Sequence, residues 1–385
     1  MKSNRLQALP PYLFIEIDKK KRAKLASGAD VINLGVGDPD RPTPRFIIDR
    51  MAEAVYEPAN HRYPFDEGVP EFRQSAADFM HSRFGVALDA HTHVLTTIGS
   101  KDGIAHLPLA VVNPDDVVLV PTPGYPVYNS GAIFAGGRPF TLELTEAHGW
   151  LPDLDAIPAD VARQARLIWV NYPNNPTAAV APLEFYEKLV AFARKHDLFI
   201  ASDVAYGETY FDQPPHSVLE VDGALDRAIE FHSLSKTFNM TGWRIGFAAG
   251  NPDLIAALAK VKGNCDSGQF NAIQWAGKEA LDHVDHPDVV AMRDLYLQRR
   301  DALCDGLASI GIEMPKPNAS FFCWGKCPPG MASMDFAARV LDEADVLLIP
   351  GKGFADHCDG YFRAALTVEV DRLQEAVERI GRIKW

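Results

Sequence analysis

Two serines and a lysine follow one another closely at the end of a predicted buried strand. In HSLSKTFNMTGWRIGFAAG (232–250), Ser233, Ser235 and Lys236 come directly after the strand. Arg244 lies eight residues beyond the lysine. Two hydroxyls and a guanidinium suit a phosphate dianion, and a deprotonated lysine beside them can form a Schiff base with an aldehyde. Ser-x-Ser-Lys is a weak signal by itself, because most lysines are solvated surface charges, so the interpretation depends on the rest of the chain.

An aspartate at the end of a second predicted strand could partner a cation. Asp203 follows LFIAS, a run without a charged residue. Because an unpaired buried charge is costly, this carboxylate needs a partner, and a protonated pyridine nitrogen would serve. Tyr206 and Asn175, the latter in NYPNNPT, could both donate a hydrogen bond to a phenolate oxygen on the same ring. The alternatives are a helix N-cap for Asp203 and simple turn chemistry for Asn175.

Short β-rich runs alternate with helical stretches from about residue 92 and would position these side chains. Predicted strands cover 92–99, 117–120, 165–173, 198–203, 228–233 and 244–250. This order implies right-handed crossovers and a largely parallel α/β sheet. In such a sheet, ligands bind beyond the carboxyl ends of the strands. We therefore expect the polar residues at these strand ends to meet in one crevice.

The chain changes character after about residue 290, where longer helical patterns accompany three further predicted strands. These strands are SFFCWGK (320–326), VLLIPG (346–351) and YFRAALT (361–367). The pattern predicts a smaller α+β domain, completed by the first forty residues. The predicted organisation is a large domain of residues 41–290 and a small domain made of residues 1–40 and 291–385.

Four motifs, in order along the chain, resemble the class I/II aminotransferases, which are fold-type I enzymes dependent on pyridoxal 5′-phosphate (PLP). They are NYPNNPTAA, SDVAYGETY, SLSKTFNMTGWRIG and YFRAALTV, and the similarity covers the whole chain. The resemblance implies a large domain with a mostly parallel central sheet flanked by helices, plus a small α+β domain. In one departure from the family pattern, Ala178 stands where the NNPTG turn usually has glycine.

The resemblance implies cofactor-binding roles for the matching residues. Lys236 corresponds to the lysine that forms the Schiff base with PLP, and Asp203 to the residue paired with the pyridinium nitrogen. Tyr206 and Asn175 correspond to the donors to the phenolic oxygen, and Tyr125 to the aromatic ring stacked on the cofactor. The implied phosphate ligands are Ser100, Lys101, Ser233, Ser235, Arg244 and, from the other subunit of a homodimer, Tyr63.

Substrate binding and mechanism also follow from the resemblance. Arg363 corresponds to the arginine that binds the substrate α-carboxylate, with Gly35 and Asn175 as further contacts. Lys236, once released from the cofactor, would act as general base. Asp203, which keeps the cofactor ring protonated, and Tyr206 are the other catalytic residues that the resemblance implies. Transfer of the amino group to 2-oxoglutarate by ping-pong kinetics is expected.

Three other segments resemble the LL-diaminopimelate aminotransferases, which belong to lysine biosynthesis. They are LPPYLFIEIDKKK, NCDSGQFNAIQWAG and LLIPGKGFADHCDGYFRAAL. Candidate contacts to the distal end of this substrate are Tyr12, Asp66 and Asn271, with Lys101 as a positive charge. The alternatives are a broader alanine, aspartate or aromatic aminotransferase and a PLP-dependent carbon–sulfur β-lyase, which would need no oxo-acid acceptor.

Composition excludes several other classes of function. The 385 residues contain 38 basic and 51 acidic side chains, and this net charge of −13 argues against nucleic-acid or anionic-membrane partners. No stretch has the apolar length of a secretory or membrane segment. The five cysteines are scattered, which favours reduced thiols in the cytoplasm. Cys323, Cys327 and Cys358 lack the usual zinc spacing, so no metal is predicted.

Overall fold

The computed structural model describes residues 2–9, 14–64 and 67–385, with residues 14–17 described by their backbone alone. A seven-stranded sheet has the order β2-β8-β7-β6-β5-β3-β4. Neighbouring strands from β4 to β7 are parallel, whereas β8 is antiparallel to both β7 and β2. Its strands are β2 (Val94–Thr97), β3 (Val117–Thr122), β4 (Arg138–Glu143), β5 (Ala165–Asn171), β6 (Phe199–Asp203), β7 (Ala228–Ser233) and β8 (Gly246–Gly250). The predicted largely parallel sheet is confirmed.

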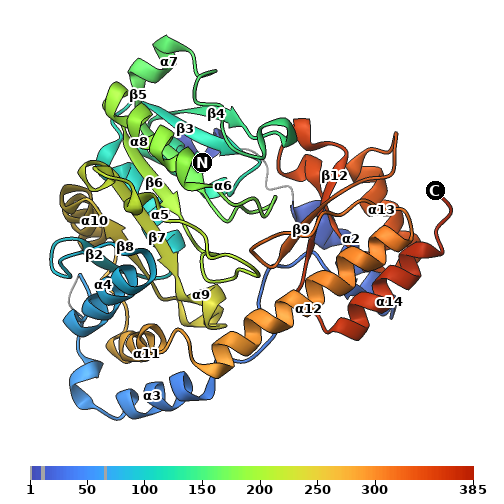
Figure 1. The fold of residues 1–385 in the computed structure, drawn as a ribbon, viewed down its shortest axis with the longest axis horizontal. Helices are drawn as coiled ribbons and strands as arrows, with labels where there is room; N and C mark the ends of the chain where they lie inside the picture. The colour runs from blue at the N-terminus through green and yellow to red at the C-terminus, as the bar shows by residue number, and fades with distance from the viewer. Residues whose placement is uncertain (1, 10–13, 65–66) are drawn as a thin grey trace.

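Helices cover both faces of this sheet, which explains why its strands are nearly continuous apolar runs (Figure 1). Alternate residues of β5 point to opposite faces: Leu167 and Trp169 belong to one core, Ile168 and Val170 to the other. The helices on the two faces and between the strands are α3 (Arg45–Val55), α4 (Pro70–Phe84), α5 (Ser100–Val111), α6 (Pro126–Ala135), α7 (Ala159–Gln164), α8 (Leu183–His196), α9 (Leu234–Thr237), α10 (Pro252–Cys265) and α11 (Asn271–Asp282).

A third core lies among the C-terminal elements, coloured orange and red in Figure 1, together with the blue N-terminal segment. Its β-structure is a three-stranded antiparallel sheet, β11-β12-β9, and a parallel pair, β1 with β10. The elements are α2 (Phe14–Ala26), β1 (Ile32–Asn33), α12 (Pro287–Ser309), β9 (Phe322–Lys326), α13 (Ser333–Ala344), β10 (Val346–Leu347), β11 (Ile349–Pro350), β12 (Tyr361–Ala365) and α14 (Val370–Gly381). The short helix α1 (Asn4–Gln7) instead contacts α6.

Helix α12 connects these regions. Val289, near its start, packs in a core of the large sheet, whereas Tyr296 and Leu303 pack in the C-terminal core. The predicted domain limit at residue 290 therefore falls inside a continuous helix. Among the described residues, no helix is both long and apolar enough to span a membrane.

Candidate functional site

A cavity of about 480 Å³ lies where the strand ends of the large sheet face the C-terminal sheet. Twelve of the residues predicted above line it. They are Gly35, Ser100, Lys101, Tyr125, Asn175, Asp203, Tyr206, Ser233, Ser235, Lys236, Arg244 and Arg363. Most of these residues lie just after the carboxyl ends of β2, β3, β5, β6 and β7. The others lie in or beside β1, β8 and β12, so the fold brings together residues up to 328 positions apart.

Lys236 is placed by the short helix α9 that directly follows β7. Its Nζ donates a hydrogen bond to the Gly37 carbonyl oxygen at 3.0 Å and lies 5.6 Å from the centre of the Phe321 ring. Burial lowers the pKa of Lys236 to about 8, and the nearby charges of Arg244 and Arg363 act in the same direction, partly opposed by Asp38. A larger share of this amine is therefore neutral near pH 7 than for an ordinary lysine.

Asp203 lies at the carboxyl end of β6 and is 5% exposed. The Tyr128 hydroxyl donates to its Oδ2 at 2.7 Å, and the Ala205 N–H donates to its Oδ1 at 3.2 Å. Burial raises the pKa of Asp203 to about 6, although these two hydrogen bonds lower it. A cation brought beside this carboxylate would stabilise its ionised form.

Arg363 is fixed in position by contacts from three segments. Its Nη1 donates to Asn175 Oδ1 at 2.7 Å and its Nη2 donates to the Gly35 carbonyl oxygen at 2.8 Å. Its guanidinium lies 4.0 Å from the centre of the Phe322 ring. Because Asn175 accepts from Arg363 through its oxygen, its amide NH₂ remains to donate to another group in the cavity.

An anion-binding arrangement occupies the other end of the cavity. Helix α5 begins at Ser100 without a side-chain cap, so its first N–H groups and its dipole favour an anion. Gly99 has φ +71°, and a Cβ there would lie 2.4 Å from Arg244 Nη2. The guanidinium thus lies directly against the backbone of the turn. With the hydroxyls of Ser233 and Ser235, this donor set fits a phosphate dianion.

Four predicted residues do not line the cavity: two lie elsewhere in the structure, and two fall outside the described residues. Tyr63 is 86% exposed on this single chain, and Asn271 begins α11 without lining the cavity. Tyr12 and Asp66 lie outside the described residues. All four were predicted as distal or shared contacts, and one chain alone does not test the prediction.

The sequence interpretation missed two residues of the site: Tyr128, which donates to Asp203, and Phe322, whose ring lies against the Arg363 guanidinium. Tyr128 lies on the buried face of α6, three residues after Tyr125, and this helical spacing was the available signal. Phe322 lies in the apolar run SFFCWGK, where a residue under a guanidinium cannot be told from an ordinary core residue.

Ala178 adopts the left-handed backbone conformation, with φ +59°, in the turn between β5 and α8. A side chain costs about 1–2 kcal/mol in this region, which offsets what a glycine loses in chain entropy and buried methyl surface. We therefore expect Ala178→Gly to change the free energy of unfolding by less than about 0.5 kcal/mol. The equally buried Ala181 has no positive φ, and Ala181→Gly is expected to lose about 1.5 kcal/mol. Equal losses in urea titrations of the two variants would contradict this account.

The fold and the cavity define the class of protein. The family model for class I and II aminotransferases matches residues 29–380, so the chain belongs to this family, and it is a PLP-dependent transaminase. Within the family it is 54% identical over 383 residues to the LL-diaminopimelate aminotransferase of Aquifex aeolicus, covering 99% of both chains. It is 52% identical over 386 residues to the enzyme of the same name from Syntrophobacter fumaroxidans, covering 100% of this chain and 99% of the relative.

A solved structure supports the same fold. The substrate-bound structure of BacF from a Bacillus species superposes with a TM-score of 0.94 at 34% identity, and the match covers 99% of this chain and 97% of that one. The fold predicted from the four motifs is confirmed.

Proposed function

We propose that the cavity binds PLP with its phosphate at the start of α5 and its ring above Asp203. Ser100, Ser233, Ser235 and Arg244 would hold the phosphate, with Lys101 beside them at the cavity wall. Tyr125 would stack on the ring, while the Tyr206 hydroxyl and the Asn175 amide would donate to the ring's phenolic oxygen. The observation that carries this placement is the cavity that joins the anion-binding groups at the start of α5, a buried lysine of lowered pKa and a buried carboxylate.

The chain's own residues then divide the work of transamination. Bound PLP supplies a protonated ring that accepts electrons as the substrate Cα loses its proton. Lys236 would hold the cofactor covalently through Nζ and, when displaced by the amino donor, take the Cα proton as a neutral amine. Asp203 would keep the ring nitrogen protonated. Arg363, already oriented by Asn175 and Gly35, would bind the α-carboxylate through two parallel hydrogen bonds.

We propose a homodimer with shared active sites that works in the cytoplasm. Tyr63 is compatible with the dimer, because its ring is 86% exposed on one chain and is therefore accessible to a partner subunit. Tyr63 would reach the phosphate of the neighbouring site, and Asp66 and Asn271 its substrate. The five free cysteines suit a reducing compartment.

We also propose that residues 41–290 and residues 1–40 with 291–385 form the two domains.

The amino donor that we propose is LL-2,6-diaminopimelate, with 2-oxoglutarate as acceptor, in lysine biosynthesis. Support comes from the relatives that carry this name, which match at 48–54% identity over nearly their full length. The donor carries a second amino-carboxylate end. Tyr12, Asp66, Asn271 and Lys101 are the residues that we propose to bind it.

A donor panel tests this proposal. Purified holoenzyme would receive LL-diaminopimelate, alanine, aspartate, phenylalanine or cystathionine, each with and without 2-oxoglutarate. We expect the highest kcat/KM with LL-diaminopimelate and no turnover without the acceptor. Turnover of alanine without that of diaminopimelate would overturn the donor. Pyruvate released from cystathionine in the absence of acceptor would indicate a β-lyase instead.

The lowered pKa of Lys236 predicts how its reactivity depends on pH in the cofactor-free protein. With a pKa of about 8, about one tenth of this amine is neutral at pH 7 and half is neutral at pH 8. Reductive methylation with formaldehyde and cyanoborohydride, read by peptide mass spectrometry, should reach half its maximal rate at Lys236 near pH 8. The exposed Lys260 in the same sample serves as the reference for the reagent. A midpoint above pH 10 at Lys236 would contradict the burial argument.

A further inference from the structure

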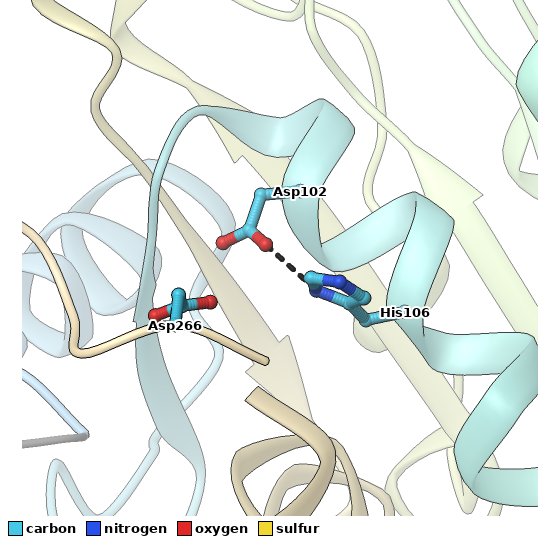
Figure 2. A group of neighbouring side chains, drawn as sticks. All are labelled: Asp102, His106 and Asp266. Carbon is cyan, nitrogen blue, oxygen red and sulfur yellow. Dashed lines mark ion pairs between the residues drawn. The ribbon is translucent and has the colours of Figure 1, made fainter. Parts of the chain in front are cut away.

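A buried lysine outside the cavity lies between two carboxylates. One carboxylate is on α5, whose start forms the anion cradle together with Arg244, Ser233 and Ser235. Lys262, on α10, is 1% exposed, and its Nζ contacts Asp102 Oδ2 and lies 2.9 Å from Asp266 Oδ2. His106 Nδ1 lies 2.8 Å from the other oxygen of Asp102. Figure 2 shows Asp102 and His106 on one helix, with Asp266 facing them from a separate segment. A buried ammonium needs such partners, because burying it alone is costly.

The cluster is better explained as an ion-pair network than as a metal site. Asp102, His106 and Asp266 have ligand atoms within 4.8 Å of one another, the one such group of three among the described parts of the chain. However, the Lys262 ammonium contacts both carboxylates and so supplies the positive charge that a metal ion would bring. The cysteines considered earlier for zinc do not form such a group in residues 67–385, which contain all of them.

The Asp102 branch of this network holds the turn that begins α5. Asp102 Oδ2 accepts a hydrogen bond from the Ile98 N–H at 2.9 Å. This bond spans Gly99, whose backbone lies against Arg244, and Ser100, which lines the cavity. A shift of Asp102 would therefore move the first N–H groups of α5, which would face a bound anion.

The Asp266 branch reaches the Arg244 loop. Asp266 Oδ1 accepts from the Gly268 N–H at 2.8 Å. The next residue, Gln269, donates through Nε2 to the carbonyl oxygens of Trp243 at 2.9 Å and Arg244 at 2.5 Å. Arg244 itself has φ +56°, so this loop adopts a conformation that its neighbours must hold in place. Asp102 thus supports the turn that begins α5, and Asp266 supports the loop that carries Arg244.

We propose that Lys262, acting through Asp102 and Asp266, is a positioning residue for the phosphate group of the cofactor. Without the ammonium between them, two half-buried carboxylates would lie close together, and their repulsion would separate the α5 turn from the Arg244 loop. The inference rests on the proposed placement of the phosphate at Ser100 and Arg244.

The test compares PLP with pyridoxal, which has the aldehyde and ring but no phosphate. Dissociation constants of both would be measured by absorbance titration of the cofactor-free protein. For Lys262→Met, we expect the PLP dissociation constant to rise at least tenfold and that of pyridoxal to change less than twofold. The control Lys278→Met removes a partly exposed lysine paired with Asp282 and should change neither constant. Equal weakening of both ligands, or no weakening of PLP, would overturn the proposal.

Asp266→Asn keeps the test decisive should Lys262→Met not fold. Its amide oxygen can still accept from the Gly268 N–H, whereas the amide NH₂ that then faces Lys262 can neither accept its hydrogen bond nor balance its charge. We expect a three- to tenfold weaker PLP complex with unchanged pyridoxal affinity. An unchanged PLP constant would count against the Lys262 network. Wild-type protein that binds PLP and pyridoxal equally well would instead overturn the placement of the phosphate, and with it the proposed cofactor site.

Discussion

Lys236→Ala is expected to reduce kcat/KM for transamination by a factor on the order of 10³–10⁴, even with saturating PLP. A positioned general base contributes about 10²–10⁴ to rate, and this variant also loses the covalent attachment that orients the cofactor. Alanine leaves the cavity larger, so PLP can still enter and rest in the phosphate cradle. Steady-state kinetics with a coupled glutamate assay would measure the loss.

A second readout makes the Lys236 prediction specific. Borohydride reduction of the wild-type holoenzyme should add the cofactor mass to the peptide that contains Lys236, and Lys236→Ala should acquire no stable adduct. Lys260→Ala changes an exposed lysine on α10 and should retain full activity and the adduct. Normal turnover by Lys236→Ala would show that another amine does the chemistry.

Asp203→Asn is the second substitution for which we expect a large effect. The amide keeps the size of the side chain and an acceptor for the Tyr128 hydroxyl but removes the charge that would pair with the ring nitrogen. A carboxylate beside a cation shifts a pKa by about 1–3 units, and each unit corresponds to about 1.4 kcal/mol. We therefore expect kcat to fall by about 10–10³, with a much smaller change in the dissociation constant of PLP.

The matched control for Asp203→Asn is Asp160→Asn, at an exposed site on α7. It should leave kcat unchanged. The absorbance of the bound cofactor, titrated between pH 5 and 9, reports ionisation in the site. If Asp203→Asn kept wild-type kcat and an unaltered titration, Asp203 would not be the partner of the ring nitrogen.

The strands and the cavity could be predicted because their signals are local. Each buried strand is a short apolar run, and the polar residues that follow it meet at one edge of a parallel sheet. β4 was not predicted, because Arg138 and Pro139 interrupt its apolar pattern. The structure explains this composition: β4 lies at the edge of the sheet, paired with β3, and such a position tolerates proline.

Contacts across the fold were beyond the reach of the sequence. The one local feature that distinguishes Lys262 from the exposed Lys260 is Asp266, four residues further on, whereas its other partner, Asp102, lies 160 positions away. Tyr128 likewise becomes a partner of Asp203 only when α6 packs on the sheet. The roles proposed for Tyr63 and Asn271 depend on the proposed second subunit, which a single chain does not contain.

Transfer of a ¹⁵N label tests the central claim of amino transfer most directly. Holoenzyme would be incubated with LL-diaminopimelate labelled with ¹⁵N at its amino groups and with unlabelled 2-oxoglutarate, and the products would be analysed by mass spectrometry. We expect ¹⁵N in glutamate in a one-to-one ratio with donor consumed, and none of this transfer in Lys236→Ala. Label recovered as ammonium, with glutamate unlabelled, would contradict transamination.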